Sequence, residues 1–536
     1  MTTFKSAIKN LLGELPLTAE LYWQFRQRGK PTGGFSFKQL QAALPAWKAQ
    51  ANAARQNARP GKRVWLMGTL RYWLEHETLL GLALAGMGHQ VTLAFFPYAN
   101  WQKPIERFDL RRQNAYVLDA LSAASPLVQP VSWMYLRNYA AELPAELQQA
   151  VAQIALQDTQ YTLQIEEVDL NSKLYQRRLE RNLHAARVAW DWWRANAHRP
   201  DVVIIPNGSI LEFGAVYQVC RYLQIPVTTY EFGEQRERIW FAHNGEVMRQ
   251  DTSALWQVWK DTPLTEAQWE EVRALFAARQ KASLWENFSR RWQGVPGEGG
   301  EKVRAALNLD ARPIALLAAN VIGDSLTLGR QIFSESMTEW LTRTVQAFAA
   351  RPETQLVVRI HPGERYTQGP SVADVVRRAL PELPPHIHLV AADAPINTYD
   401  LIEIADVGLV YTTTVGLEMA MSGVPALIAG DTHYRGKGFT YDPPTWEAYF
   451  GILDKILAAP VEKRLAHAQV ERAWTYAYRF FFDYPMPFPW HLLHFWKDVA
   501  EWQLERVLSP EGMARYAETF AALTGAPRLW HNEATR

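Results

Sequence analysis

Hydroxyl and carboxylate side chains gather in residues 407–440, where the pattern predicts strand, turn, helix, strand and loop. The run VGLVY has the length and apolar character of a strand buried in a parallel sheet. Three hydroxyl side chains follow it, Thr412, Thr413 and Thr414, and would cap a helix through LEMAMSG. Such a helix start can hold a phosphate, and Glu418, one turn later, could reach a ribose hydroxyl. The pattern predicts one wall of a nucleotide site, although an ordinary capped strand–helix unit would also fit it.

Polar residues also follow the other strands predicted in this half of the chain. Ligands of open α/β sheets bind beyond the carboxyl ends of the strands. The further candidates at these ends are Asn320, Asp324, Ser325, His361, Pro362, Glu364, Arg435 and Lys437. They offer hydroxyls for phosphates and cations from side chains, rather than carboxylates that bind a metal. We therefore expect a nucleotide site without a metal or a separate cofactor, although a single His or loop cation is more often structural.

The first half of the chain contains candidates for an acceptor site and a catalytic base. The strand ends offer Gly68, Arg71, Asn207 and Glu212 on the acceptor side. A general base that deprotonates an incoming hydroxyl could be His76, Glu75 or Glu231. Alternatively, Glu75 and His76 begin a helix, where an acidic residue complements the dipole. The turn after the first strand lacks a G-x-G-x-x-G pattern, so no dinucleotide cofactor is indicated.

Alternating strand and helix patterns predict an α/β fold with two doubly wound, Rossmann-like sheets. In the first half the predicted strands are KRVWLMGTL, VTLAFFPY, DVVIIPNGS and IPVTTYEFGE. In the second half they are PIALLAANV, QLVVRIHPGE, HIHLVAAD, VGLVYTT and PALIAG. Residues from about 101 to 198 are expected to be mostly helical. Ser336 and Glu339 predict a capping box at the start of the helix MTEWLTRTVQAFAA.

The length of 536 residues is too great for one hydrophobic core. We expect a helical extension over residues 1–60 and a first Rossmann-like domain with helical insertions over 61–293. The second such domain follows the GVPGEGG linker, over residues 294–442. Residues 443–536 are rich in aromatic side chains and are predicted to form helices that pack across the junction of the domains.

The composition excludes several classes of protein. The 56 lysines and arginines balance 55 acidic residues, which argues against a nucleic-acid partner. The single cysteine, Cys220, fits a reducing, cytoplasmic setting. No apolar run approaches the roughly 20 residues of a membrane span. The segment FKSAIKNLLGEL has apolar residues at helical spacing beside lysines, so it either packs on the protein or lies on a membrane surface.

Three segments resemble a known family. RIHPGE, the run YTTTVGLEMAMSGVPALIAG and the following HYRGKGFT look like the capsular polysaccharide biosynthesis proteins, within the GT-B glycosyltransferases. That group includes bacterial transferases of 3-deoxy-manno-octulosonic acid, and the teichoic-acid glycerophosphotransferases share its sheet topology. The resemblance extends over roughly residues 313–440 and is much looser before residue 207.

The resemblance implies two domains facing a cleft and a metal-independent transfer of a sugar. The donor would be a CMP- or UDP-linked sugar, and the acceptor a cell-surface glycan or a lipid-linked glycan at the inner face of the membrane. His361 would contact the donor phosphate or an acidic sugar, the threonines the phosphate, and Glu418 the ribose. Arg435 and Lys437 would stabilise the charge that develops on the leaving nucleotide.

Three alternatives remain open: a glycerophosphotransferase, a sugar-nucleotide 2-epimerase on the same fold, or a non-catalytic partner that binds a nucleotide sugar or glycan. An epimerase needs no acceptor, so the large helical first domain disfavours it.

Overall fold

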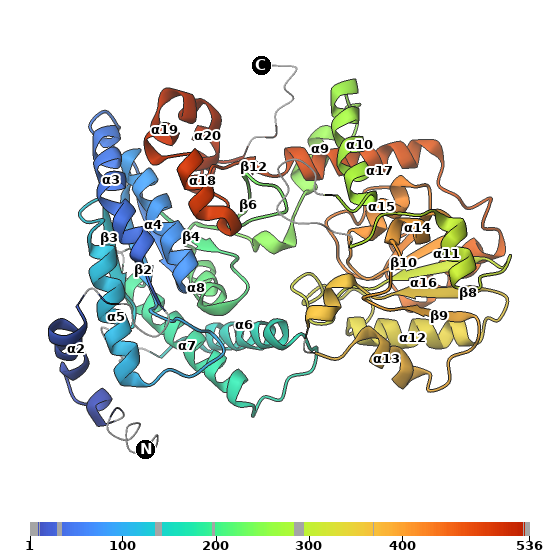
Figure 1. The fold of residues 1–536 in the computed structure, drawn as a ribbon, viewed down its shortest axis with the longest axis horizontal. Helices are drawn as coiled ribbons and strands as arrows, with labels where there is room; N and C mark the ends of the chain where they lie inside the picture. The colour runs from blue at the N-terminus through green and yellow to red at the C-terminus, as the bar shows by residue number, and fades with distance from the viewer. Residues whose placement is uncertain are drawn as a thin grey trace.

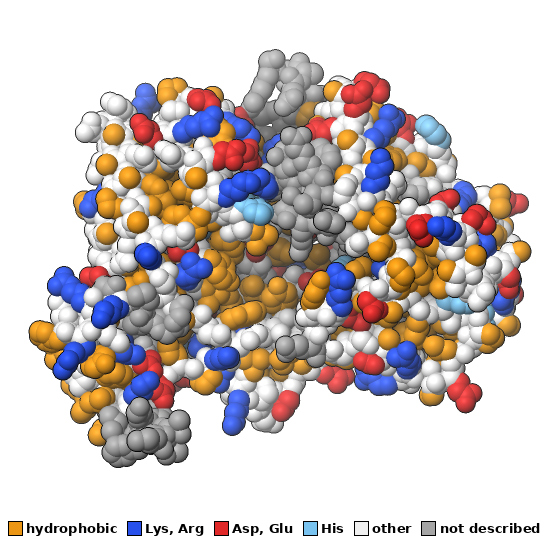
Figure 2. Space-filling view, in the orientation of Figure 1, with side chains coloured by type: hydrophobic (Ala, Val, Ile, Leu, Met, Phe, Trp, Pro, Cys, Tyr) orange, Lys and Arg blue, Asp and Glu red, His pale blue; other side chains and the backbone are white. Residues whose placement is uncertain are grey.

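The computed structural model describes residues 9, 11–28, 30, 35–134, 142–195, 199–283, 294–367, 369–528 and 530. The chain forms two α/β units side by side, each built around one sheet (Figure 1). Basic and acidic side chains are interspersed over the face shown in Figure 2, in keeping with the balanced charge.

The first unit has a seven-stranded sheet in the order β12-β6-β5-β4-β1-β2-β3. Its strands are β1 (Arg63–Gly68), β2 (Gln90–Phe95), β3 (Val128–Ser132), β4 (Val202–Pro206), β5 (Val227–Glu231), β6 (Arg238–His243) and β12 (Met486–Pro487). The first five are parallel, whereas β6 and β12 are antiparallel to their neighbours. The parallel order β3-β2-β1-β4-β5 is that of a Rossmann sheet.

Residues 101–198 are mostly helical, as predicted, but they also contain strand β3, which was not predicted. It contains Pro130, which cannot donate to a sheet ladder, and it occupies the edge of the sheet, where a proline is tolerated. The remaining elements before the second sheet are helical. They are α2 (Thr18–Tyr22), η1 (Trp23–Gln27), α3 (Lys38–Arg55), α4 (Arg71–Gly86), α5 (Arg107–Ser122), α6 (Ala145–Leu163), α7 (Lys173–Trp193), α8 (Leu211–Tyr222), η3 (Val247–Arg249), α9 (Ser253–Trp259) and α10 (Glu266–Gln280).

The second unit has a parallel five-stranded sheet in the order β11-β10-β7-β8-β9. Its strands are β7 (Ile314–Ala318), β8 (Gln355–Arg359), β9 (Ile387–Val390), β10 (Val407–Val410) and β11 (Ala426–Ile428). Its helices are α11 (Gly300–Ala306), α12 (Met337–Ala349), η4 (Pro362–Tyr366), α13 (Val372–Ala379), α14 (Thr398–Ile404), α15 (Val415–Met421) and α16 (Trp446–Ala458). All five strands lie within predicted strands, and the prediction of two doubly wound sheets is confirmed.

Local signals in the second unit also match the structure, with one difference. Gly423 adopts a positive φ of 76° after α15, which is the left-handed stop expected there. The Ser336 side chain accepts from the Glu339 backbone and caps α12. The Glu339 carboxylate accepts instead from the Glu335 backbone, so the reciprocal half of the predicted capping box is displaced by one residue.

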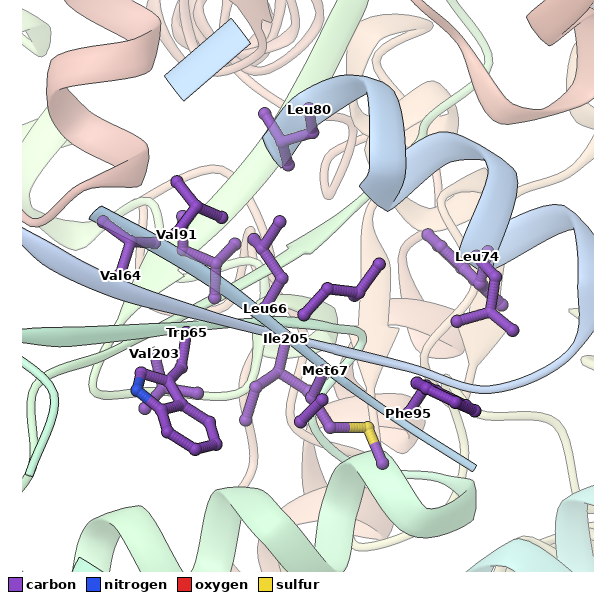
Figure 3. Packing of buried hydrophobic residues seen from close by; sticks show 14 of the residues in the cluster. Val64, Trp65, Leu66, Met67, Leu74, Leu80, Val91, Phe95, Val203 and Ile205 are labelled. Carbon is purple, nitrogen blue, oxygen red and sulfur yellow. The ribbon is translucent and has the colours of Figure 1, made fainter. Parts of the chain in front are cut away.

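Both faces of strand β1 contribute buried side chains to the core of the first unit. Val64 and Leu66 point to one side of the strand and Trp65 and Met67 to the other, as the two-residue period of a strand requires (Figure 3). All four side chains are buried, because helices cover the sheet on both faces.

The C-terminal segment belongs to both cores. Its elements are α17 (His467–Tyr478), η5 (Arg479–Asp483), β12, η6 (Leu492–His494), α18 (Phe495–Glu501), α19 (Leu504–Leu508) and α20 (Pro510–Leu523). Phe480 and Phe481 pack in the core of the second unit, whereas Phe488 and Trp490 pack in that of the first. Among the described residues, no helix is long and apolar enough to cross a membrane. Half of the N-terminal segment FKSAIKNLLGEL, residues 4–8 and 10, lies outside the described residues.

Candidate active site

The carboxyl ends of the two sheets line the same interdomain space. Ser209, which follows β4, and Ser325, in the loop after β7, line one small cavity that is open to solvent. Gly233, which follows β5, and Thr414, which follows β10, line a second cavity that is also open to solvent. We call them the first and second cavities. Both lie where ligands of doubly wound sheets bind.

The loop between β7 and α12 lines both cavities. Its Ser325 and Leu328 face the first cavity, and Leu326 faces the second. Strands β7 and β10 are neighbours although β8 and β9 lie between them in sequence, so their ends meet at the switch point of the sheet. The Asn320 amide oxygen accepts from the Thr412 backbone at 3.1 Å across this point. Asn320 and Thr412, which were both predicted at strand ends, thus lie together at this point.

A carboxylate with a raised pKa lies beside the first cavity. The Asn207 amide donates to Glu231 at 3.1 Å, and the Phe232 backbone donates to its other oxygen at 3.0 Å. Burial raises the pKa of Glu231, and these two hydrogen bonds act in the opposite direction. The Ser209 hydroxyl, in turn, donates to the Asn207 amide oxygen at 2.6 Å. A chain of hydrogen bonds therefore connects Glu231 to the wall of the cavity.

Carboxylates of both domains influence the pKa of Tyr161, which lies on α6. Its pKa is raised to about 12, mainly by burial and then by the negative charges of Asp324 and Glu231. The pKa of Tyr72 is also raised, by burial and then by Glu231. Tyr161 itself lines the first cavity. The arrangement combines a carboxylate suited to general base catalysis with a neutral phenol that can donate a hydrogen bond.

Two arginines that the sequence analysis did not identify line the first cavity. Arg249 donates to the Gly329 carbonyl at 2.8 Å, and Arg330 donates to the Met248 carbonyl, so each joins the two domains. Asp431 lies 3.9 Å from Arg249 and 3.8 Å from Arg330. Arg330 follows Ser325 by five residues in the same loop, and this position in a predicted site loop is the sequence signal that indicates it. Arg249 follows β6, a strand that the sequence analysis did not predict.

Glu418 does not occupy the ribose-binding position expected from the sequence. It forms an ion pair with Arg279 of α10 at 2.7 Å, and the two side chains are only 3% and 5% exposed. Burial raises the pKa of Glu418, whereas the Arg279 charge lowers it. Arg279, together with Thr414, lines the second cavity. The surface presented to a ligand is therefore that of the arginine, and the carboxylate lies behind it.

The two cations predicted to hold the leaving nucleotide have other contacts. Arg435 donates to the carbonyls of Ile428 and Pro443, both at 2.7 Å, and so holds its own loop. Lys437 is partly buried, which lowers its pKa, and the nearby Asp251 opposes this effect. Arg435 therefore stabilises its own loop, and its role toward a leaving nucleotide stays a prediction.

The remaining donor-side candidates are divided between structural and exposed positions. Glu364 is buried and accepts from the Val372 backbone at 3.2 Å, so it stabilises the start of α13 rather than facing a ligand. Pro362 begins η4, and the exposed His361 caps it by accepting from the Gly363 backbone at 3.0 Å. The Thr413 carbonyl accepts from the Tyr434 hydroxyl at 2.6 Å.

His76 is a core residue and not a base in the cleft. One ring nitrogen lies 3.2 Å from the Trp490 carbonyl and the other 3.4 Å from the Tyr230 hydroxyl. The rings of Phe488 and Phe495 also pack against it. Burial lowers its pKa to about 3, so it is neutral at physiological pH. The C-terminal segment supplies part of this enclosure, and His76 lines neither of the two cavities.

Three other candidates from the first domain also have structural roles. Glu75 is 2% exposed and pairs with Arg71, one turn earlier on α4, at 3.1 Å. At Gly68 an added Cβ would lie 2.1 Å from a carboxylate oxygen of Glu77, so this glycine makes room for a core side chain. Glu212 is buried in the first turn of α8. Of the predicted bases, only Glu231 lies beside the cleft.

No group of three His, Cys, Asp or Glu side chains that could hold a metal ion occurs among the residues the structure describes. No protein-family model matches the sequence, and no curated protein matches it.

Two Rossmann-like domains whose strand ends line a shared cleft form the GT-B-type arrangement that the sequence resemblance implied. Solved structures with similarity to the chain include KpsC, the β-Kdo 2,4 transferase of Thermosulfurimonas dismutans. Its identity is 17% and its TM-score 0.32, over 51% of this chain and 78% of that one. The UDP-GlcNAc 2-epimerase of Neisseria meningitidis has 11% identity and a TM-score of 0.25, over 78% and 100% of the two chains.

The wall teichoic acid polymerase TagF has 11% identity and a TM-score of 0.20, over 83% of this chain and 97% of that one. These three proteins are of the kinds that the sequence resemblance and its alternatives named.

Proposed function

We propose that the protein is a glycosyltransferase that moves a sugar from a nucleotide-activated donor to a cell-surface glycan or a lipid-linked glycan, without a metal ion. One observation carries the proposal. Tyr161 and Ser209 of the first domain and Ser325 of the second line one cavity, and hydrogen bonds through Asn207 connect Glu231 to Ser209 at its wall. A transferase needs such a place, because the acceptor oxygen and the donor carbon must meet between the two binding surfaces.

In this proposal the second cavity holds the nucleoside and its phosphates. Trp240 and Phe480 provide aromatic surfaces for a base, and Thr414 and Arg279 provide a hydroxyl and a cation. Positive charge fixed at this position would stabilise the negative charge that develops on the departing phosphate.

The reaction itself takes place in the first cavity. The Glu231 carboxylate accepts the proton of the acceptor hydroxyl as that oxygen forms a bond to the anomeric carbon. The bond between this carbon and the phosphate oxygen breaks, and the nucleotide leaves with the bonding electrons. Arg249 and Arg330 line this cavity and suit an acidic group on the sugar that is transferred.

A Glu231→Gln variant tests the proposed base. The amide keeps the size of the side chain but cannot accept the proton, so we expect turnover to fall by roughly 10²- to 10⁴-fold. Donor binding, measured as thermal stabilisation by a panel of CMP-, UDP- and GDP-linked sugars, should persist. Glu270→Gln, which changes an exposed carboxylate of α10, is the matched control.

Two results would contradict the proposal. Full turnover in Glu231→Gln would exclude the carboxylate as the base, and the absence of stabilisation by any nucleotide sugar would exclude the donor site. Interconversion of a sugar nucleotide without an acceptor would instead identify an epimerase.

A further inference from the structure

Helix α2 and the π-helical turn η1 that continues it have two different faces. Ala19 and Trp23 are buried against the first domain. Leu17, Leu21 and Phe25 follow at spacings of four residues on the opposite side, where they are 64%, 51% and 79% exposed. An apolar stripe at this spacing is normally directed into a protein core. Here it is directed into solvent.

Other exposed apolar side chains lie close to the stripe in the sequence. Six of the 15 large apolar side chains that are exposed among the described residues fall within residues 11–25. We call them the N-terminal apolar surface: Leu11, Leu15, Leu17, Leu21, Tyr22 and Phe25. Single exposed apolar residues are ordinary, but a contiguous group marks an interaction surface.

The ion pairs of this segment leave a positive charge beside the apolar surface. Glu14 pairs with Arg107 at 2.5 Å, and Glu20 pairs with Arg111 at 2.5 Å, so both acidic residues are neutralised by α5. The next three charges along the chain are all basic and exposed. They are Arg26, Arg28 and Lys30, and none of them forms an ion pair with a described residue.

The position of the segment leaves it accessible. Helix α2 lies at the end of the first domain that is remote from the second domain (Figure 1). In the corner of Figure 2 that corresponds to α2, apolar and basic side chains lie next to each other. Docking through this surface would therefore not cover the cleft between the domains.

We propose that the N-terminal apolar surface docks on an anionic lipid surface, with Arg26, Arg28 and Lys30 against the headgroups. Leucine and phenylalanine beside arginine and lysine are typical of helices that lie in a bilayer interface, and basic residues close to an anionic leaflet are attracted to its headgroups. A second copy of the chain fits less well. In a two-fold dimer through this surface, Arg26, Arg28 and Lys30 of one chain would lie close to the same three cations of the other chain and would repel them.

Vesicle flotation of the full chain tests the proposal. Wild-type protein should float with vesicles of phosphatidylcholine and phosphatidylglycerol, less with phosphatidylcholine alone, and less as salt is added. The triple variant Leu17→Ser/Leu21→Ser/Phe25→Ser should lower the partition coefficient at least roughly tenfold. Arg26→Gln/Arg28→Gln/Lys30→Gln should remove the preference for the anionic vesicles.

The matched control is Val461→Ser, which removes an apolar side chain that is 84% exposed in the second domain and should leave flotation unchanged. Unchanged thermal melting of the variants will show that they are folded. The proposal is overturned if the wild type does not float, or if the triple variant floats equally well. A wild-type dimer that the triple variant converts to a monomer would also overturn it, in favour of self-association.

Lipid docking is independent of the proposed reaction. Nucleotide binding in the same variants should match the wild type, so failure of one proposal will not be mistaken for failure of the other.

Discussion

The ion pair between Glu418 and Arg279 gives the sharpest test of the site, because the sequence and the structure assign Glu418 different roles. A ribose contact would make this carboxylate a determinant of nucleotide affinity. In the structure it instead neutralises a buried arginine that is also held against the rings of Phe276 and Phe481, at 5.3 and 5.6 Å. We therefore expect Glu418→Gln to affect stability far more than binding.

The size of the effect follows from the burial of both partners. Removal of one member of a buried ion pair leaves an uncompensated charge, which costs about 3–5 kcal/mol. In a unit of this size each kcal/mol lowers Tm by about 2–4 °C, so the melting of the second domain should fall by roughly 6–20 °C. The double variant Glu418→Leu/Arg279→Met removes both charges and should recover most of this loss, since apolar replacements of buried pairs are close to neutral.

Differential scanning calorimetry and titration calorimetry with CMP and UDP will measure the two quantities separately. We expect Glu418→Gln to change the Kd of the better nucleotide by less than roughly threefold, because the carboxylate lies behind Arg279. Native melting combined with a tenfold or greater loss of affinity would refute this reasoning and restore the ribose role.

Three further predictions concern other contacts. In the Asn207→Ala variant, the Glu231 carboxylate loses a hydrogen bond that favours its charged form. The pKa of Glu231 should therefore rise, and the acidic limb of the pH–rate profile should move to higher pH. An acidic limb that does not move would exclude this contact. Glu166 accepts hydrogen bonds from two backbone N–H groups at the start of α12, at 2.8 and 2.9 Å, and so joins the domains. The Glu166→Ala variant should lose about 0.5–2 kcal/mol of stability and show a larger radius of gyration in small-angle scattering. Its exposed neighbour gives the control, because Glu167→Ala should change neither quantity. The pKa of His76 is about 3 in the folded protein and ordinarily 6.5, so between these pH values the unfolded chain takes up a proton that the folded chain does not. The free energy of unfolding therefore falls as the pH drops from 6.5 towards 3, and His76→Phe should make urea unfolding less dependent on pH over this range. An unchanged dependence would contradict the burial of His76.

The parts of the fold that depend on local pattern could be predicted from the sequence. Strand β10 is a continuous apolar run, and Gly423 marks the helix end that follows it. The proximity of Asn320 and Thr412 also follows from sequence, because the strand order of a doubly wound sheet places their two strands together. These inferences need only residue types, spacing and topology.

The failures share a physical cause, which is contact with a segment far away in the chain. Glu75 and His76 belong to an acidic and polar triplet that is typical of an exposed helix start. The first is neutralised by Arg71, and the second is enclosed by residues such as Trp490, more than 400 positions later. No local pattern indicates that such a partner exists. Glu418 was assigned to a ligand for the same reason, since Arg279 lies on a helix that precedes the second sheet.

The return of the chain to the first sheet has a consequence for biosynthesis. Strand β12 adds to β6, and Phe488, Trp490 and Phe520 complete the core of the first domain. About 280 residues separate the end of β6 from the end of α20. At the usual rates of translation, a ribosome needs roughly 15–60 s to add them. Throughout this interval, the nascent first domain presents an open sheet edge and an incomplete aromatic core, whereas the second sheet can close before synthesis ends. The N-terminal domain should therefore be the last to mature, and the part of the nascent chain that most needs a chaperone.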